Sequence, residues 1–331
     1  MAIRPRMRLD PAQTLAATSW DSAVKCRSIN VAPGEPLLGC TPVNACTLTS
    51  KPGDRKPELT EVDASTRLSP FVRWAGSKRL LSKQIVEHLP EEFGAYFEPF
   101  LGGGSVLLAT RPRNAVVGDA LAPLVTTWKV IRDDCDGLMD ELNRHGFDKT
   151  VYEAMKQLEP ASDVEVAARF MILNRGAYGG LWRVNARGAF NVPWSQPKSP
   201  SPTSEANVRA VSEYLRNSEV HIQNADFQAI TMAAKAGDLV FFDPPYSRTI
   251  TQRPFVHYQE KLFDWDEQTR LAKEARRLVD LGASVLLTNS PHPDIRELYP
   301  DFAIVDVVRH SALGSTATRS TTIAERIFIS H

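Results

Sequence analysis

The sequence predicts an α/β fold: an open, mostly parallel sheet covered by helices, with a mainly helical unit inserted into it. The order strand, glycine turn, helix and strand between Ala95 and Asp119 is how such a sheet begins. Two later runs, 238–242 and 283–287, are apolar without alternation, as in strands covered on both faces. The stretch from Asp119 to Asp238 is too long for one ordinary crossover, which predicts the insertion.

The individual elements follow from the spacing of apolar residues. A helix over 77–89 is predicted by Leu80, Leu81, Ile85 and Leu89, which recur at helical spacing. The strands that we expect lie at 95–98, 115–119, 238–242 and 283–287. The further helices that we expect open at 106–109 and span 151–158, 164–173 and 271–281. The Gly-, Asn- and Trp-rich stretch 174–194 is expected to be irregular.

The composition is that of a globular protein whose first segment stands apart. The chain has 331 residues, 43% apolar and 24% charged, which excludes a wholly disordered or fibrous protein. Residues 1–67 carry scattered prolines without apolar periodicity, so we expect a disordered or loosely attached extension, or the upstream translation of a later start. We expect a main domain at 68–122 and 218–331, and an inserted domain at 123–217.

The sequence shows neither a targeting signal nor cysteines spaced to bind a metal or to form a disulfide scaffold. No run approaches the roughly 18 apolar residues that span a bilayer, and the arginine-rich segment 1–10 is not followed by an apolar stretch. Four cysteines show neither metal-ligand pairing nor the density of a disulfide scaffold. We therefore expect a reduced, intracellular protein without a metal site or a membrane segment.

Charge is balanced overall and uneven locally. Basic and acidic residues both number 39, so the total does not indicate a strongly basic nucleic-acid binder. The stretch 166–204 nevertheless holds no acid and five basic residues, namely Arg169, Arg175, Arg183, Arg187 and Lys198. Such a local excess fits either a polyanion site or an ordinary solvated face.

The turn after the first strand has the sequence Glu98-Pro99-Phe100-Leu101-Gly102-Gly103-Gly104-Ser105. Glycines at this place let the backbone approach a nucleotide-like ligand, although a plain tight turn explains them too. The third glycine of a dinucleotide fingerprint would fall on Leu107, and no Gly-Lys-Ser/Thr follows, so neither a dinucleotide site nor a phosphate loop is indicated. Asp119, at the next strand end, is placed to bind ribose hydroxyls, which favours an adenosyl cofactor without a pyrophosphate.

The tetrapeptide Asp243-Pro244-Pro245-Tyr246 directly follows an expected buried strand. Two prolines remove two backbone donors and favour a rigid, extended turn. Such a turn can direct the Asp243 carboxylate and the Pro244 carbonyl at one exocyclic amine, while Tyr246 offers a flat face to a planar ring. The alternative is a rigid loop with a packed tyrosine.

Together these motifs resemble the Dam-type branch (class alpha) of the DNA adenine-N6 methyltransferases. The blocks that match are 73–78 (RWAGSK), 98–105 (EPFLGGGS), 173–193 (LNRGAYGGLWRVNARGAFNVP) and 243–246 (DPPY), with a weaker echo at 310–322. The resemblance covers roughly 70–330. It implies a Rossmann-like S-adenosylmethionine-dependent methyltransferase sheet and, at 123–217, a target-recognition domain that carries a hairpin.

The resemblance also implies roles for individual residues. The positions expected to bind S-adenosylmethionine are Trp74, Lys78, Glu98, Pro99, Phe100, Gly102, Gly104, Asp119, Asp226, Phe227 and Asp243. The catalytic positions are Asp243, Pro244, Pro245 and Tyr246. The positions expected to bind DNA are Arg73, Tyr178, Leu181, Arg183, Arg187 and Pro193. The sequence departs from the Dam pattern at Gly179, where asparagine is usual, and at Pro197, where an aromatic is usual, so the GATC target is left open.

We expect methyl transfer from S-adenosylmethionine to a flipped-out adenine of duplex DNA. Adenine methylation of RNA and a catalytically inactive DNA-binding module are the alternatives. Methylation of a protein glutamine is disfavoured, because those enzymes prefer Asn-Pro-Pro-Tyr and lack an insert like 174–194. The expected protein is a monomer, cytoplasmic and DNA-associated, encoded by a bacterium or a phage, and a restriction endonuclease is a candidate partner.

Overall fold

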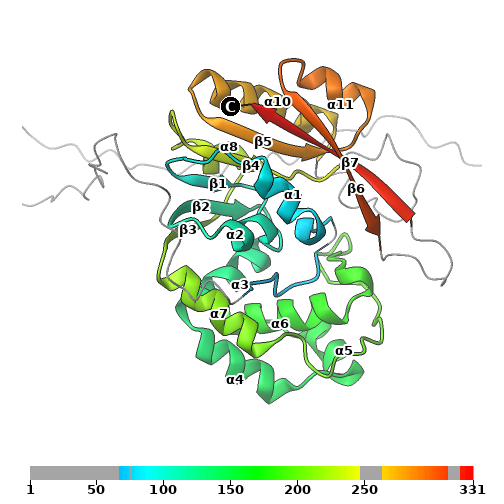
Figure 1. The fold of residues 1–331 in the computed structure, drawn as a ribbon. Helices are drawn as coiled ribbons and strands as arrows, with labels where there is room; N and C mark the ends of the chain where they lie inside the picture. The colour runs from blue at the N-terminus through cyan, green and yellow to red at the C-terminus, as the bar shows by residue number, and fades with distance from the viewer. Residues whose placement is uncertain (1–66, 75, 247–262, 312–320, 331) are drawn as a thin grey trace, which may run out of the picture. The chain divides into compact units, whose positions relative to one another are not determined.

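The structure, a computed structural model, describes residues 67–74, 76–246, 263–311 and 321–330, all within the compact unit that runs from Asp54 to His331. The described residues form one seven-stranded sheet in the order β3-β2-β1-β4-β5-β7-β6 (Figure 1). The strands are β1 (Tyr96–Glu98), β2 (Asn114–Asp119), β3 (Glu219–Asn224), β4 (Leu239–Phe242), β5 (Ser284–Asn289), β6 (Ala303–Ser311) and β7 (Thr321–Ser330).

The first five strands run parallel, and β7 pairs antiparallel with both β5 and β6. The prediction of an α/β fold with a mostly parallel sheet is confirmed. The expected N-terminal extension lies outside the described residues, as does most of the 310–322 echo.

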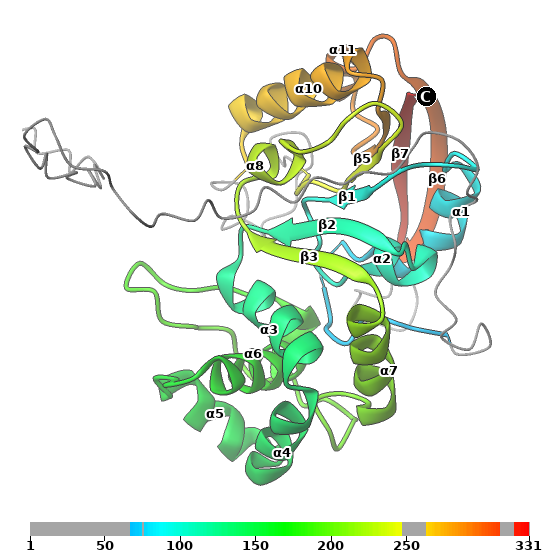
Figure 2. The ribbon, with the colours of Figure 1, turned by 90° about the vertical axis from the view of Figure 1, so that its left-hand side faces the viewer.

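Helices cover the sheet on both faces, because successive residues of a strand point to opposite sides. In β4, Leu239 and Phe241 join one apolar cluster, while Val240 and Phe242 join the other. The helices of the first cluster are α1 (Ser82–Glu87), α2 (Ser105–Thr110), α3 (Ala122–Asp133) and α7 (Glu205–Arg216). The helices of the second are α8 (Phe227–Thr231), α10 (Trp265–Asp280) and α11 (Pro293–Leu298), on the other side in Figure 2.

Between β2 and β3 the chain is mainly helical, as expected. In addition to α3 and α7 it forms α4 (Cys135–His145), α5 (Lys149–Gln157) and α6 (Asp163–Gly176). Side-chain oxygens of Asp134, Asp148 and Ser162 cap the amino ends of these three helices, which fixes where each begins. One apolar cluster runs from the sheet through α3 to α6, so the domain division at 123–217 stays a prediction.

The helix expected over 77–89 is divided in the structure. A 3-10 turn, η1 (Lys78–Leu80), precedes α1, and the Leu81 amide donates to the Lys78 carbonyl at 2.8 Å. The tighter pitch buries the Lys78 side chain and leaves Leu80 63% exposed. Leu80, which contributed to the spacing that predicted one continuous helix, therefore lies outside the core. No helix among the described residues is long and apolar enough to cross a membrane.

Candidate functional site

The point where the strand order reverses lies between β1 and β4. From β1 the sheet continues to β2 and β3 on one side, and to β4 and β5 on the other. In open α/β sheets the ligand crevice lies at the carboxyl ends of the strands at such a point. Glu98 ends β1 and Asp243 follows β4, so the topology brings the two predicted motifs to one place.

The glycine turn after β1 is packed under two indole rings. Gly102 and Gly104 have φ values of 48° and 63°, a left-handed conformation that favours glycine. A Cβ on Gly102 would lie 2.6 Å from the Trp74 ring, and one on Gly104 would lie 2.6 Å from the Trp128 ring. Trp128 Nε1 also donates to the Gly102 carbonyl at 3.0 Å. The glycines are thus required by close protein packing, which joins the Trp74 block to the turn.

Asp119, at the end of β2, is held by backbone amides. Its Oδ2 accepts from the Gly102 amide and its Oδ1 from the Leu121 amide, both at 3.0 Å. Burial raises the pKa of this carboxyl, and the amides oppose that shift. The carboxylate therefore has a fixed orientation beside the glycine turn, as a ribose-binding acid would need.

Three aromatic side chains pack against one another near the glycine turn. Phe100 stacks on Phe227 with the ring centroids 5.5 Å apart, and Phe263 meets Phe100 edge-on at 5.4 Å. The adjacent Asp226 caps α8 and forms a two-pronged ion pair with Arg270, at 2.8 and 2.6 Å. This arginine lowers the pKa of Asp226, so the expected adenine-binding carboxylate is ionised and already has a strong partner.

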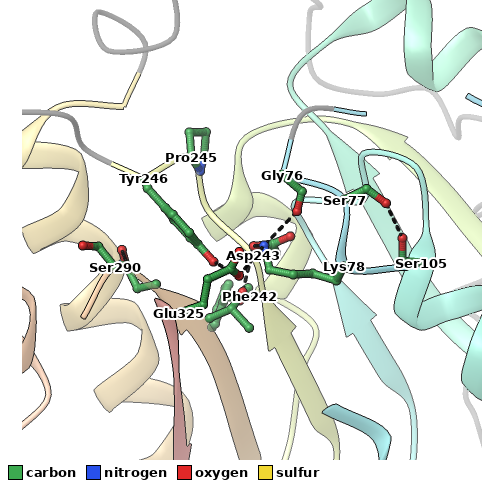
Figure 3. A network of polar contacts seen from close by, with 12 residues as sticks. Gly76, Ser77, Lys78, Ser105, Phe242, Asp243, Pro245, Tyr246, Ser290 and Glu325 are labelled. Carbon is green, nitrogen blue, oxygen red and sulfur yellow. Dashed lines mark hydrogen bonds and ion pairs between the residues drawn. The ribbon is translucent and has the colours of Figure 1, made fainter. Parts of the chain in front are cut away.

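The Asp243 carboxylate lies at the centre of a polar network (Figure 3). Its Oδ1 is 2.6 Å from Lys78 Nζ and accepts from Thr288 Oγ1 at 2.7 Å. Burial raises the pKa of Asp243, and Lys78 and Thr288 oppose the shift. Lys78 Nζ also donates to the Gly76 carbonyl at 3.0 Å. Two residues predicted from separate motifs are therefore in direct contact.

Tyr246 is fixed in the same network by a residue that sequence reasoning missed. Its hydroxyl donates to Glu325 Oε2 at 2.7 Å, and Lys78 Nζ lies 4.9 Å from the centre of its ring. Glu325 is on β7 and fully buried. Burial raises the pKa of Tyr246 well above its usual range, which keeps its hydroxyl protonated as a donor.

The turn between Asp243 and Tyr246, which contains two prolines, is held in place by its neighbours. Pro244 is buried, and the Pro245 carbonyl accepts from Gln268 Nε2 of α10 at 3.1 Å. Gln268 in turn accepts from Asn289 at the end of β5, at 3.0 Å. The turn is thus tied to the neighbouring helix and strand, as the prediction of a rigid turn requires.

The inserted unit carries the expected hairpin. The Asn185 backbone amide donates to the Ala189 carbonyl at 2.8 Å, and the Asn191 backbone amide donates to the Arg183 carbonyl at 3.1 Å. Arg183 lies on the hairpin, where its Nε donates to Asn191 Oδ1 at 2.7 Å. Arg187 at the tip and Pro193 after the hairpin are exposed. The arginines are therefore presented outward on a short, hydrogen-bonded support.

Arg73 is joined to the insert by one buried amide side chain. Asn174 Oδ1 accepts from the Arg73 amide at 2.9 Å, and its Nδ2 donates to the Arg73 carbonyl at 2.8 Å and to the Gly180 carbonyl at 3.1 Å. Gly180 packs so tightly that an added Cβ would lie 2.4 Å from Arg73 Cβ. The predicted Trp74 block and the recognition stretch are therefore held together by Asn174, which the site prediction did not include.

The remaining predicted DNA contacts have different environments. Tyr178 is 53% exposed, while Leu181 is half-buried against the core. Of the five basic residues in 166–204, Arg169 donates to the Met155 carbonyl at 2.7 Å and so closes the carboxyl end of α5. Arg169 therefore has a structural role in the described chain, and the two readings of the stretch 166–204 stay open for the other basic residues.

Glu98 is a buried acid with defined donors. Its Oε2 accepts from the Tyr96 hydroxyl at 2.8 Å and from the Leu107 amide at 3.1 Å. Burial raises the pKa of Glu98 to about 8, and the nearby Asp243 adds to the shift. Glu98 is therefore largely protonated near neutral pH.

A Rossmann-like sheet with an acid at the end of both β1 and β2, and Asp-Pro-Pro-Tyr after β4, defines the methyltransferase class. Residues 74–313 match the family described as D12 class N6 adenine-specific DNA methyltransferase. The chain is 33% identical over 268 residues to the type II methyltransferase M1.LlaDCHI of Lactococcus lactis subsp. cremoris, covering 78% of this chain and 94% of that protein.

Two further relatives agree with this match. The identity is 34% over 265 residues to the type II methyltransferase M.MjaIII of Methanocaldococcus jannaschii, covering 73% of this chain and 91% of that protein. The identity is 30% over 257 residues to the DNA adenine methylase of Escherichia coli K12, covering 75% of this chain and 91% of that protein. The chain belongs to the D12 class N6 adenine-specific DNA methyltransferases, and the predictions of the family and of DNA adenine methylation are confirmed.

The environment of Glu98 makes stability depend on pH. Between the ordinary carboxyl value of 4.5 and about 8, the folded protein binds a proton that the unfolded chain releases. This contribution is complete below pH 4.5 and is lost as pH rises through 8, at up to about 1.4 kcal/mol per pH unit. Glu98→Gln, which cannot ionise, is expected to gain stability relative to the wild type between pH 5.5 and 8. Urea unfolding at several pH values measures this, and a pH-independent difference would contradict it.

Proposed function

We propose that this protein transfers a methyl group from S-adenosylmethionine to N6 of an adenine that has been flipped out of duplex DNA. The observation that carries the proposal is the Asp243 carboxylate, held by Lys78 and Thr288 at the point where the strand order reverses. Family membership supports the reaction, and the roles of individual residues are our assignment.

The residues of the crevice suit S-adenosylmethionine by their chemistry. The oriented Asp119 carboxylate matches ribose hydroxyls, and the half-buried Phe100 ring, supported from behind by the buried Phe227 ring, offers apolar surface to the adenine ring. We assign the remaining contacts to Trp74, Lys78, Glu98, Pro99, Gly102, Gly104, Asp226 and Asp243. When bound, the cofactor supplies an electrophilic methyl group on a sulfonium centre.

Asp243 is proposed to orient the attacking amine. Both of its contacts described above go to Oδ1, so we assign Oδ2, together with the Pro244 carbonyl, to the N6–H donors. Those hydrogen bonds favour a pyramidal nitrogen whose lone pair forms the new C–N bond. The carbon–sulfur bond breaks with its electrons going to sulfur, and N6 then loses a proton. Fixing this geometry beforehand supplies much of the acceleration.

Tyr246 is proposed to hold the flipped base. Extrusion of a base costs a few kcal/mol, and stacking on an aromatic ring returns about 1–3 kcal/mol. Lys78 approaches one face of the Tyr246 ring, so the base would stack on the opposite face. Pro245 completes the turn between the two groups.

We assign recognition of the DNA sequence to the hairpin and to Arg73. Arg183 and Arg73 are proposed to contact guanines in the major groove, where bidentate arginine contacts are the commonest specific pairing. Tyr178, Leu181 and Pro193 would wedge beside the flipped base, and Arg187 would contact the backbone. The exposure of Tyr178 and of the hairpin arginines supports this arrangement.

The target sequence and the partners are also proposals. We propose GATC or a related site. The names of two relatives, type II methyltransferases, favour a restriction endonuclease as a partner. One recognition insert for each catalytic domain suits a monomer that acts on one strand at a time, and a DNA substrate suits a cytoplasmic location.

The first test incubates the protein with duplex DNA and S-adenosylmethionine and maps modified adenines at single-base resolution. We expect N6-methyladenine at one short motif, and a loss of about a hundredfold or more in Asp243→Asn, because the oriented acceptor is gone. Duplex RNA is the control substrate. Cofactor binding without methyl transfer would favour the inactive module, and methylation of RNA alone would overturn the choice of DNA.

Replacing Tyr246 separates its ring from its hydroxyl. Tyr246→Ala removes the stacking surface and is expected to reduce kcat/KM by about ten- to a hundredfold, the equivalent of about 1–3 kcal/mol. Tyr246→Phe keeps that surface and is expected to lose less. Steady-state kinetics on a duplex with one target site compares them, and equal damage from both variants would contradict a stacking role.

The specificity of the insert can be altered at one position. Gly179 has φ 63° and ψ 12°, a left-handed conformation that asparagine tolerates better than most residues. Gly179→Asn therefore adds a polar side chain near the expected base contacts with little change in the backbone. We expect an altered set of methylated motifs with unchanged stability, measured by modification mapping and thermal unfolding. An identical motif set would mean that position 179 does not read bases.

A further inference from the structure

Glu325 is a fully buried acid on a strand whose neighbouring residues on the same face are apolar. It lies on β7 between the neighbouring strands β5 and β6, and its side chain has no solvent exposure. On the same face of β7, Ile327 is fully buried as well. Burial of a carboxylate is costly unless it gains hydrogen bonds and an opposite charge. Both kinds of partner are found at the candidate active site.

The contacts of Glu325 reach two groups that we have placed in that site. Its Oε2 accepts from the Tyr246 hydroxyl at 2.7 Å and lies 3.4 Å from Lys78 Nζ (Figure 3). Lys78, only 3% exposed, is therefore shared between Glu325 and Asp243. One ammonium group bridges two carboxylates that come from β7 and from the turn after β4.

We propose that Glu325 is a positioning residue for methyl transfer, which orients the Tyr246 ring and the Lys78 ammonium and, through Lys78, the Asp243 carboxylate. The inference rests on the proposed function, and it adds a residue outside the assigned motifs. Glu325 acts through Tyr246 and Lys78 and itself contacts no reacting atom. Lys78 and Asp243 are also assigned to the cofactor, but the groups assigned to its ribose and adenine belong to other elements. The loss of Glu325 should therefore affect turnover more than cofactor binding.

The chain offers a matched control for this test. Glu274 of α10 is also buried, accepts from the Thr231 hydroxyl at 2.7 Å and pairs with Arg277 at 2.6 Å. Like Glu325 it is a buried acid whose partners include a hydroxyl donor and a cation, but its described contacts reach none of the assigned catalytic residues. Glu325→Gln and Glu274→Gln therefore each replace a buried carboxylate that is paired with a hydroxyl and a cation, although Arg277 is 46% exposed and Lys78 only 3%.

In the full-length protein, Glu325→Gln is expected to lower kcat about ten- to a hundredfold, the range expected for a lost hydrogen bond to a charged group. The dissociation constant for S-adenosylmethionine should change by less than about threefold, well under the 1.4 kcal/mol that a tenfold change represents. Glu274→Gln should keep the wild-type kcat. The double variant Glu325→Gln with Tyr246→Phe should lose a smaller factor in kcat than the product of the two separate losses, because both changes break the same hydrogen bond.

The pH profile supplies a readout that a purely structural role would not move. The titratable groups that act on Asp243 in the described structure are Lys78, Tyr96, Glu98, Tyr246 and Glu325. The negative charge of Glu325 raises the pKa of Asp243, so Glu325→Gln should move the acid limb of the kcat profile to lower pH. Glu274→Gln should leave the limb in place.

Each outcome decides the proposal. An unchanged kcat and acid limb in folded Glu325→Gln would overturn it, as would an equal loss in Glu274→Gln. If Glu325→Gln does not fold, Glu325→Asp keeps the charge but withdraws the carboxylate by one methylene. Its kcat should still fall, and a wild-type kcat would overturn the proposal. A wild-type protein that binds the cofactor but methylates no DNA would instead refute the proposed function.

Discussion

The ion pair between Lys78 and Asp243 is the contact on which the candidate site depends. It joins a 3-10 turn near the beginning of the described chain to the turn after β4, across the point where the strand order reverses. Both partners are largely removed from water, so each depends on the other to offset its desolvation. Lys78 is therefore the cation around which the Asp243 carboxylate, the Tyr246 ring and the Glu325 side chain are gathered.

Around this pair, close packing and directed hydrogen bonds join three segments that are distant in sequence. Trp74 lies on Gly102, so the block before η1 cannot move independently of the glycine turn. Asn174 binds both backbone groups of Arg73 and the carbonyl of Gly180, so the residue before that block moves with the insert. The elements assigned to cofactor, base and DNA are thus joined to one another by direct contacts.

The strands β1, β2, β4 and β5 and the motifs could be predicted from sequence because their signals are local, whereas β3, β6 and β7 were missed. Apolar runs such as 283–287 mark covered strands, and Asp243 to Tyr246 is recognisable within four residues. The partners of these motifs could not be predicted, because Thr288, Arg270 and Asn174 reach them only through the folded chain. Glu325 could be noticed in the sequence, because it alternates with Ile327 and Ile329 and therefore lies on the same face of β7 as these apolar residues. An acid on such a face marks a buried polar contact but does not name its partner.

The place of β7 in the sheet affects how the site is assembled during protein synthesis. β7 follows all the other strands of the described sheet in the chain, yet it inserts between β5 and β6. While the ribosome is still translating this segment, Lys78 and Asp243 have been made, but the carboxylate that anchors Tyr246 has not. In a chain that leaves the ribosome in order, the hydrogen bond that anchors Tyr246 can therefore form only after Lys78 and Asp243 are both available to pair.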